Sequence, residues 1–362
     1  MRLIFNLEKV QQEEKPCKPF QGNLNGEKMI FQTKRLKVRK AETSDVDMYL
    51  SLWNSGKVMK NVGFPNGLGI SEEEFIKKIE EYDESEFDKS LVVIEKESGK
   101  KIGECKLGSP NEEGISSPDV KFLPEYWGKG FGKELLNALC KYIFSKTQTK
   151  IIETSPNVKN IASQKIVEAV GGKEIKRFVY HFPPEMQHFT EDVHGKIYHA
   201  HKKDWLEKNM RLKKIKNKEE KSRICKKIIE LLPNWFGIPE ANEAYIKGVE
   251  DTDFYTAYMF EKEVGFFSII SHFKETSEIY VCGVLPDFHR LGIGRELLQF
   301  AVQELEQQEK KFLTVKTLSS AHPDKGYACT REFYKKNGFI PLEEFKDLWG
   351  EANPCLFLVK RL

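Results

Sequence analysis

The chain has 362 residues, of which 40% are hydrophobic and 31% charged, and its 58 basic and 55 acidic side chains leave a net charge of +3. This length exceeds what one hydrophobic core usually supports, so we expect two domains, and the apolar runs are too short to cross a bilayer. The seven cysteines show no C-x-x-C spacing of the kind found in zinc or redox sites. This pattern predicts a reduced, cytoplasmic protein that binds no metal.

The N-terminal segment differs from the rest of the chain. Its apolar run, Leu3 to Phe5, is too short for the hydrophobic region of a secretory signal, so we expect residues 1–28 to be an N-terminal extension. From Met29 onward, strand-like and helix-like segments alternate, which indicates an α/β or α+β fold.

The two halves of the chain show the same order of elements. The first half is predicted to contain strands at 36–39, 91–95, 101–107, 119–123 and 150–154, and helices near 44, at 133–144 and at 162–170. The second half is predicted to contain strands at 211–217, 254–260, 264–272, 278–285 and 312–317, and helices at 218–232, 296–308 and 329–336. We therefore expect two domains of similar fold, 29–210 and 211–362.

The basic run from Arg211 to Lys227 has two interpretations. Clustered Lys and Arg are typical of a nucleic-acid-binding surface. However, Leu212 and Ile215 have the spacing of buried strand positions, and Ile224 and Ile228 lie on one helical face. This pattern favours an ordinary strand and helix with charged outer sides, so we expect neither a nucleic-acid nor a membrane partner.

One eleven-residue motif occurs twice. YWGKGFGKELL begins at Tyr126 and FHRLGIGRELL at Phe288, and their last glycines, Gly132 and Gly294, hold the same place in the two copies. Each copy follows a strand that a proline stops and precedes a predicted helix. The repeated motif therefore lies at the same strand-to-helix junction in both domains.

The chemistry of such a junction suits phosphate. A helix N-terminus offers backbone N–H groups without partners and about half a positive charge. Glycine leaves no Cβ between the backbone and a ligand, and basic side chains add positive charge. The motif glycines are Gly130, Gly132, Gly292 and Gly294, and the basic residues beside them are Lys129, Lys133, Arg290 and Arg295. The alternative is a tight turn that serves packing alone.

Two other phosphate-binding motifs do not fit. A Walker A loop needs Gly and Ser or Thr where this chain has Trp127 and Glu134. A dinucleotide fingerprint needs a third glycine where the two copies have Leu135 and Leu297.

On these residues the chain resembles the GNAT superfamily of acetyl-coenzyme A-dependent N-acetyltransferases. That family has the motif Gln/Arg-x-x-Gly-x-Gly/Ala, which is similar to His289–Gly294 and Trp127–Gly132. Trp127, the T-x-R-L match at Thr33 and the N-x-x-S match at Asn160 resemble the branch that acetylates the N-termini of ribosomal proteins. The resemblance covers residues 29–362 and implies, for each domain, a mixed, mostly antiparallel twisted sheet flanked by helices.

The resemblance also implies where coenzyme A would bind. In the family, the motif amides, here including those of Phe131, Leu291 and Ile293, hold the pyrophosphate. The strand before the loop pairs with the pantetheine arm, which points to the backbones of Phe122, Leu123, Val284 and Leu285. Asn160 and Ser163 would contact the coenzyme, although Asn160 is alternatively a helix cap.

Acetyl transfer needs a base and an acid, because a lysine-type amine with a pKa of about 10.4 is mostly protonated and the coenzyme leaves as a thiolate. The segment around Tyr334 resembles the family's A-x-x-F-Y-x-x-x-G-F pattern, in which the tyrosine is the acid; core packing is the alternative. Glu278 precedes Gly292 at a spacing that resembles that of the base in histone-acetylating members, or is simply a solvated glutamate. Strand alternation places it on the face of Cys282 unless a bulge intervenes.

The first domain lacks both groups at the same spacings, where it has Val167 and Ser116, and Asp119 is its nearest carboxylate. The resemblance therefore implies an N-acetyltransferase whose second domain is the main catalytic unit and which uses acetyl-CoA as co-substrate for direct attack by a small primary amine. The aromatic and acidic segment from Leu232 to Tyr245 suits such an acceptor. The alternatives are acetylation of a peptide N-terminus, or a first domain that binds coenzyme A without catalysis.

Overall fold

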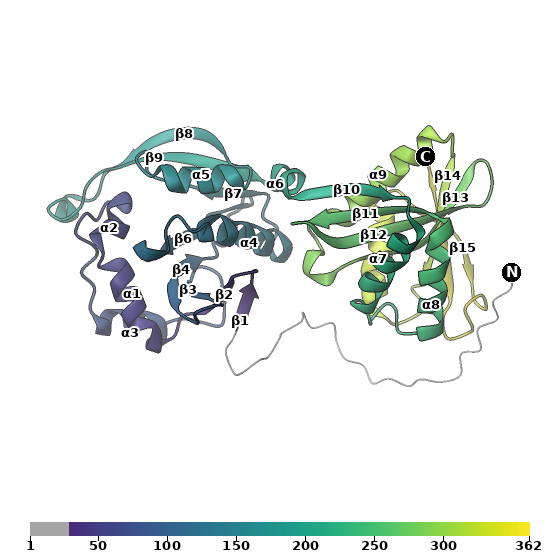
Figure 1. Cartoon of the computed structure of the whole chain (residues 1–362), viewed down its shortest axis with the longest axis horizontal. Coiled ribbons are helices and arrows are strands. Elements are labelled where there is room, and N and C mark those ends of the chain that lie inside the picture. Colours follow the sequence, from purple (N-terminus) through teal and green to yellow (C-terminus); the bar gives the residue numbers. More distant parts are fainter. Residues whose placement is uncertain (1–28) are drawn as a thin grey trace. The chain divides into compact units, whose positions relative to one another are not determined.

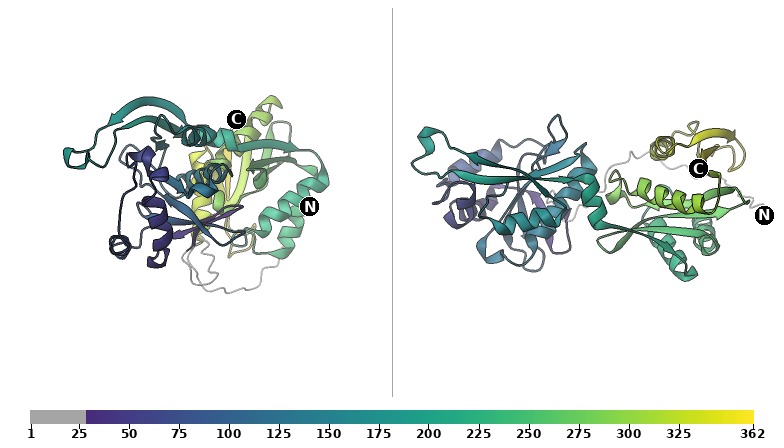
Figure 2. Two further views of the ribbon diagram at one scale, coloured as in Figure 1. Left: turned by 60° about the vertical axis from the view of Figure 1, so that its left-hand side comes forward. Right: turned by 90° about the horizontal axis from the view of Figure 1, so that it is seen from above.

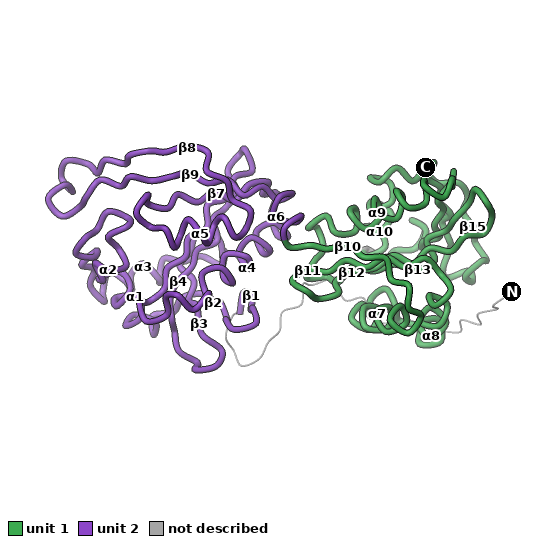
Figure 3. Tube along the Cα trace, turned by 45° about the horizontal axis from the view of Figure 1, so that its top comes forward, with its two compact units in different colours: residues 1–19, 209–362 green, residues 20–208 purple. Residues whose placement is uncertain are grey.

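The computed structural model describes residues 29–362, which form two compact units, 29–208 and 209–362, called domain 1 and domain 2 below (Figure 3). The expected N-terminal extension, residues 1–28, lies outside the described residues. The division between the units falls just before the predicted boundary after Met210. Within the described part of the chain, no helix is long and apolar enough to cross a membrane.

Domain 1 places its motif helix, α4, between an N-terminal group of strands and helices and a C-terminal group. In chain order, and with the short 3-10 turns left aside, its elements are β1 (Met29–Gln32), β2 (Leu36–Lys40), α1 (Val46–Trp53), α2 (Gly56–Met59), α3 (Glu72–Glu80), β3 (Ser90–Glu95), β4 (Lys101–Lys106), β5 (Ile115–Ser116), β6 (Asp119–Phe122), α4 (Phe131–Lys146), β7 (Ile151–Thr154), α5 (Ile161–Ala169), β8 (Lys173–Tyr180), β9 (Val193–His201) and α6 (Lys202–Asn209).

The sheet of domain 1 is divided in two. Strands β1-β2-β3-β4-β6 form an antiparallel sheet, and β5-β7-β9-β8 form a second one in which only β5 and β7 are parallel. Strands β5 and β6 are separated by Ser117 and Pro118, and Pro118 has no N–H with which to continue a ladder. On one face of the first sheet, Tyr49 of α1 stacks on Phe75 of α3 in a buried core.

Domain 2 has one seven-stranded sheet in the order β10-β11-β12-β13-β14-β16-β15, in which only β13 and β14 are parallel. The expected mixed, mostly antiparallel sheet is therefore confirmed. Helices α7 and α9 cover opposite faces of it (Figures 1 and 2). The elements are β10 (Met210–Ile215), α7 (Lys218–Glu230), α8 (Pro239–Gly248), β11 (Asp253–Met259), β12 (Lys262–Ser271), β13 (Thr276–Val284), α9 (Ile293–Gln307), β14 (Phe312–Leu318), α10 (Lys325–Lys336), β15 (Ile340–Phe345) and β16 (Cys355–Arg361).

Strand β13 has a bulge that decides which side chains share a face. Ser268 pairs with Val281 whereas Ile269 pairs with Ile279, so Tyr280 is an extra residue in β13. Because side chains alternate along a strand, Glu278 lies on the same face as Val281, toward α7, and Cys282 lies on the other face. The prediction that Glu278 and Cys282 share a face is therefore wrong, because β13 contains the bulge that the prediction named as its exception.

The pairing of β13 with β14 stops at Ile279 and Val315. Beyond this point β13 runs on to Val284 and is paired with β12 alone among the described strands. The backbone groups of its last residues that face away from β12 therefore have no partner strand among the described residues, although the Val284 carbonyl contacts His289.

A buried ion pair stabilises the start of domain 1. Arg39 of β2 donates two hydrogen bonds of 2.8 Å to Asp45, and Lys101 lies 2.6 Å from the same carboxylate. Burial opposes ionisation of Asp45, but the hydrogen bonds from Arg39 and Lys101 hold its pKa below the usual value. Since the folded pKa is the lower one, the stabilisation is present above about pH 4 and is lost as the pH falls through the folded pKa.

We expect Asp45→Asn to destabilise domain 1 by about 3–5 kcal/mol near neutral pH, because Arg39 stays buried without a carboxylate. Urea unfolding of both proteins measures this difference, which should shrink in acid as the wild-type carboxyl becomes protonated. A difference that is the same at neutral pH and at the acid limit of folding would contradict this role of the pair.

Candidate active site

The two motif loops have the same backbone course. Each starts with a short 3-10 turn, Pro124–Tyr126 or Pro286–Phe288, and then has left-handed residues at Gly128 and Gly130 or at Arg290 and Gly292. Gly130 and Gly292 are the N-caps of α4 and α9, and neither helix receives a side-chain capping hydrogen bond. The first backbone N–H groups of both helices are therefore left for a ligand.

The motif glycines serve different purposes. A Cβ at Gly292 would meet nothing within 4 Å, whereas a Cβ at Gly132 would lie 2.5 Å from Ile166 and one at Gly294 would lie 3.2 Å from Phe333. At Gly132 and Gly294 the missing side chain also lets α4 and α9 pack closely on the next helix. The backbone amides of these two glycines stay candidates for phosphate binding.

In both loops the basic side chains are exposed and the large apolar side chains between them are buried. Lys129, Lys133, Arg290 and Arg295 are exposed around the helix ends, and Lys129 Nζ lies 4.8 Å from the ring centre of Tyr126. In contrast, the side chains of Phe131, Leu291 and Ile293 are buried, at most 4% exposed. These three apolar residues anchor the loops and offer only their backbone amides to a ligand.

Trp127 and His289, the first residues of the two matches to the six-residue family motif, make the same contact in the two domains. The indole N–H of Trp127 donates to the carbonyl of Phe122 at 2.8 Å, and Nε2 of His289 lies 2.6 Å from the carbonyl of Val284. Both contacts have the same spacing along the chain, and the histidine must carry its proton on Nε2 to donate there. A ring N–H at the first position of the family motif therefore contacts the last carbonyl of the preceding strand in both domains.

Hydrogen bonds within the fold reduce the number of backbone groups that could bind the pantetheine arm. The amides of Leu123 and Leu285 donate to Ile102 and Val264 at 3.0 and 2.8 Å, and their carbonyls accept from the 3-10 turns that follow. Because neighbouring residues of a strand point their backbone groups to opposite sides, those of Phe122 and Val284 face away from the preceding strand. Leu123 and Leu285 are therefore already satisfied. The carbonyls of Phe122 and Val284 are occupied by Trp127 and His289, so only the amide N–H groups of these two residues stay candidates.

The side chain of Tyr334 reaches the part of β13 that is not paired with β14. Its hydroxyl lies 3.4 Å from Sγ of Cys282, its ring packs on Phe333 and Phe339, and only 3% of the residue is exposed. Burial raises the pKa of Tyr334 well above its ordinary value and that of the Cys282 thiol to about 11. At neutral pH both groups are therefore protonated, so the Tyr334 hydroxyl has a proton to give and the sulfur of Cys282 is not a thiolate.

Glu278 is not brought into contact with Tyr334. Its carboxylate accepts hydrogen bonds from Nζ of Lys316, at 2.7 Å to both oxygens, and from Nε2 of His272 at 2.8 Å. The side chain is 15% exposed and lies on the face of α7, across the sheet from Cys282. It is therefore no free, solvated glutamate, and it must release a present partner or act through water to accept a proton.

The same positions in domain 1 carry no acid or base. Ser116 pairs with β7 as Glu278 pairs with β14, but it is fully buried and donates to the carbonyl of Gly108. Val167 stands before the helix-ending glycine as Tyr334 does, and its carbonyl accepts the equivalent loop N–H. Asp119 pairs with Lys121. The difference expected between the domains is thus present in the fold, whatever its effect on activity.

Asn160 is the N-cap of α5, where its side chain accepts from the backbone N–H of Ser163 at 3.1 Å. The capping alternative for Asn160 is therefore confirmed. This contact uses the side-chain oxygen and leaves the amide nitrogen to other partners.

Aromatic side chains gather where α7, α8 and α10 meet the bulge. Trp235, between α7 and α8, packs edge-on at 5.9 Å from the ring of His289, and its carbonyl accepts from the hydroxyl of Tyr327 at 3.3 Å. Tyr245 of α8 lies 5.6 Å from Tyr280, the bulge residue. We call Trp235, Tyr245, Tyr280 and Tyr327 the aromatic wall.

Sequence reasoning missed a second group of residues, in domain 1. Arg35 and Thr33 of the T-x-R-L match contact Glu134 in the first turn of α4, so that the turn between β1 and β2 lies against the motif loop. The glutamate occurs in both motif copies, which was the available signal. Its partner is distant in the chain, and spacing alone does not reveal such a contact.

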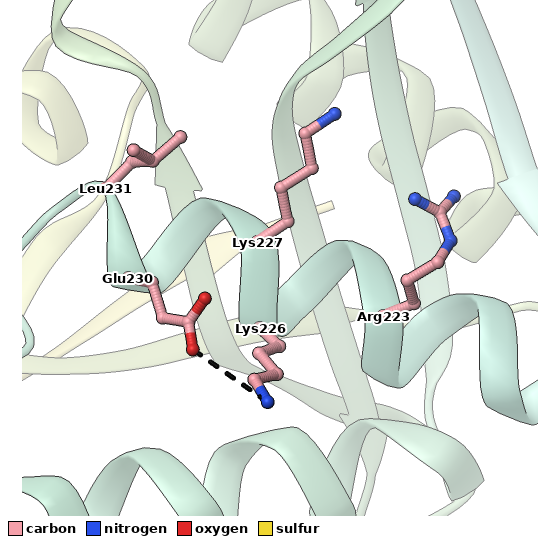
Figure 4. A pocket seen from close by; sticks show the side chains of 5 residues that line it. All are labelled: Arg223, Lys226, Lys227, Glu230 and Leu231. Carbon is pink, nitrogen blue, oxygen red and sulfur yellow. Dashed lines mark ion pairs between the residues drawn. The ribbon is translucent and has the colours of Figure 1, made fainter.

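The basic run forms β10 and α7, as predicted, and most of its charged side chains lie in ion pairs. Arg223 and Lys227 share Glu263, whose pKa falls to about 2 because their hydrogen bonds outweigh its burial, and Lys226 lies 4.0 Å from Glu230. With Leu231, these α7 side chains border an open surface hollow (Figure 4). The hollow lies on the outer side of α7 and includes none of the residues predicted to take part in binding or catalysis.

Comparisons with known proteins agree for the two halves. Residues 35–173 and residues 250–341 each match a family described as "Acetyltransferase (GNAT) domain". A curated relative, "Uncharacterized N-acetyltransferase p20" of Bacillus licheniformis, is 26% identical over 140 residues, which cover 38% of this chain and 79% of that protein.

Solved structures with a similar fold include the spermidine N-acetyltransferase of Vibrio cholerae in complex with CoA and spermine. It has 20% identity and a TM-score of 0.41, and the match covers 48% of this chain and 99% of that one. A GNAT family acetyltransferase of Elizabethkingia anophelis with acetyl-CoA bound has 20% identity and a TM-score of 0.32, over 42% of this chain and 99% of that one.

Proposed function

We infer that this chain, which belongs to the GNAT acetyltransferase family and carries one domain of that family in each half, transfers the acetyl group of acetyl-CoA to a primary amine. The observation that carries this proposal is the pair of motif loops, each of which presents uncapped helix amides and exposed basic side chains at the end of an open strand. A pyrophosphate needs these features, and a purely structural turn does not.

Each domain offers a similar set of groups to the coenzyme. The amides of the residues from Lys129 to Lys133 in domain 1, and from Arg290 to Arg295 in domain 2, would hold the pyrophosphate, with the exposed basic side chains of both loops around it. The backbone N–H groups of Phe122 and Val284 would pair with the pantetheine arm. Asn160 and Ser163 would contact the coenzyme in domain 1.

Domain 2 is the proposed catalytic unit. The amine nitrogen attacks the thioester carbonyl, the carbon–sulfur bond breaks, and Tyr334 gives its proton to the departing thiolate. Glu278 accepts the proton that the amine loses, through water, and solvent returns a proton to Tyr334. Direct attack fits the chemistry better than an acyl-cysteine intermediate, since Cys282 is a protonated thiol at neutral pH.

The acceptor is proposed to be a small primary amine. The aromatic wall combines ring faces with hydroxyl groups beside His289 and the bulge, and aromatic faces attract cationic amines. Glu240 and Glu243 are exposed on α8 in the same segment and would add attraction for a positive charge.

A second candidate function, acetylation of a peptide N-terminus by domain 1, has one observation in its favour. Glu104 of β4 is a buried carboxylate beside β6, where it accepts from the indole of Trp53 at 2.8 Å and pairs with Lys121 at 3.2 Å. Burial raises the pKa of Glu104, as expected of a base. Because domain 1 has Val167 at the position that Tyr334 holds in domain 2, it lacks the proposed acid, and we favour domain 1 as a module that binds coenzyme A without catalysis.

The experiment that tests the proposed function follows thiol release from acetyl-CoA with a panel of polyamines, aminoglycosides, amino acids and short peptides. Thiol release that depends on a small amine supports the proposal. Release with peptides alone would favour the second candidate, and absence of both turnover and coenzyme binding would reject acetyl transfer.

We expect Glu278→Gln to lower the turnover number by about tenfold, less than the usual effect of a direct acid or base, because Glu278 acts through water. The Michaelis constant for acetyl-CoA should not change. Glu275→Gln, on the turn before β13, is the matched control and should behave like wild type. Turnover by Glu278→Gln equal to that of the control would remove Glu278 from the mechanism.

A further inference from the structure

The turn between β1 and β2 is fixed to the motif helix of domain 1 by one carboxylate. Glu134 accepts hydrogen bonds from Thr33 Oγ1 at 2.5 Å, from the backbone N–H of Arg35 at 2.8 Å and from Nε of Arg35 at 2.6 Å. Burial opposes ionisation of Glu134, but these donors hold its pKa below the ordinary value. The carboxylate is therefore charged, and its charge is neutralised by Arg35 beside the helix end.

The same guanidinium reaches the motif loop. Nη1 of Arg35 donates to the carbonyl of Lys129 at 2.9 Å, and the guanidinium carbon lies 4.4 Å from the ring centre of Phe131. A peptide unit is planar and trans, so fixing the Lys129 carbonyl also fixes the direction of the Gly130 N–H. A Cβ at Gly130 would lie 3.6 Å from Nη2, so this nitrogen borders the same loop.

Domain 2 is built differently at this point. Glu296 occupies the place of Glu134 in the second motif copy, in the first turn of α9. However, β10 is the first strand of the domain 2 sheet, and among the described residues no earlier strand of that sheet exists to supply a turn like that of Thr33 and Arg35. The two loops are thus alike in backbone but differ in what holds them.

We propose that Arg35 is a positioning residue of the coenzyme site of domain 1, which holds the Lys129–Gly130 peptide ready for pyrophosphate and makes domain 1 the tighter of the two sites. This inference rests on the proposed function, since it requires that the domain 1 loop binds coenzyme A. A loop that is already ordered loses less entropy on binding, and a guanidinium beside it can donate to a phosphate oxygen.

The test uses the full chain with Gly292→Asp, which blocks the loop of domain 2, and measures the affinity for CoA and for dephospho-CoA by calorimetry. Adding Arg35→Met should weaken the binding of both ligands by roughly 10- to 100-fold, as for the loss of a charge-assisted hydrogen bond in an ordered site. Arg35→Lys keeps a charge near Glu134 but cannot also reach Lys129, so binding should stay weakened while the melting temperature stays near wild type. Arg177→Met, which removes an exposed arginine of the same domain, is the matched control.

Three results would overturn the inference. Unchanged affinity in Arg35→Lys and Arg35→Met, even with a lower melting temperature, would make Arg35 merely structural. A loss confined to CoA would place Arg35 at the 3′-phosphate instead of the loop. Weaker coenzyme binding by the chain with Gly292→Asp than by the chain with Gly130→Asp would reverse the order of the sites.

A different result would show that the proposed function itself, and not only the role of Arg35, is wrong. If the chain with Gly292→Asp binds neither ligand while Arg35 is intact, domain 1 does not hold coenzyme A, and the role of Arg35 falls with it. Binding that persists with Arg35 intact but does not respond to its replacement overturns the role of Arg35 alone.

Discussion

Tyr334→Phe is expected to lower the turnover number by about 100-fold, the lower range for the loss of a general acid. The change removes only the hydroxyl that lies 3.4 Å from Cys282, and the ring can keep its packing on Phe333 and Phe339. Coenzyme affinity should therefore stay within about a factor of two. Steady-state kinetics together with calorimetric titration of coenzyme A separate the two quantities.

The control for this variant is Tyr255→Phe, which removes the hydroxyl of another fully buried tyrosine of domain 2. It should leave turnover unchanged. Because burial raises the pKa of Tyr334 well above its ordinary value, Tyr334 stays protonated through the neutral range and should produce no loss of activity below about pH 10. Equal turnover by Tyr334→Phe and wild type would exclude Tyr334 as the acid.

Gly292→Asp is expected to abolish turnover, whereas Gly130→Asp should leave most of it. Both glycines are left-handed N-caps, a backbone conformation that Asp tolerates better than most residues, so folding should survive the change. A carboxylate at this point repels a pyrophosphate. Thiol release at saturating acetyl-CoA and acceptor measures the effect.

The neutral variants Gly292→Asn and Gly130→Asn separate charge from shape. Asn has nearly the shape of Asp without its charge, so Gly292→Asn should retain more activity than Gly292→Asp. Loss of activity in Gly130→Asp, with Gly292→Asp still active, would reverse the roles proposed for the two domains.

The features that occur in both domains could be predicted from the sequence. Two copies of one motif, each after a proline-stopped strand, predicted helices that the structure places at Phe131–Lys146 and Ile293–Gln307. Local chemistry fixes these features, since glycine is the residue that most readily enters the left-handed region and proline ends a strand. Spacing alone also identified Val167 as the residue of domain 1 that holds the position of Tyr334 in domain 2, because the helix and its terminal glycine recur in both domains.

Features that depend on partners distant in the chain were not predictable in the same way. The bulge at Tyr280 appears only in the register between β12 and β13, and it moved Glu278 to the face opposite Cys282. The packing of Gly132 on Ile166 and the contact between Arg35 and Glu134 join different elements. The division of the domain 1 sheet at Pro118 and the β8–β9 hairpin were also not foreseen. Spacing within one segment does not record such pairings.

The most direct measurement of the central claim is a calorimetric titration of coenzyme A into the full chain. We expect two binding sites per chain, and one site per chain in either Gly130→Asp or Gly292→Asp, because each domain presents its own uncapped loop. A stoichiometry of one in the wild-type chain, unaffected by one of these two substitutions, would contradict the assignment of both loops as coenzyme sites.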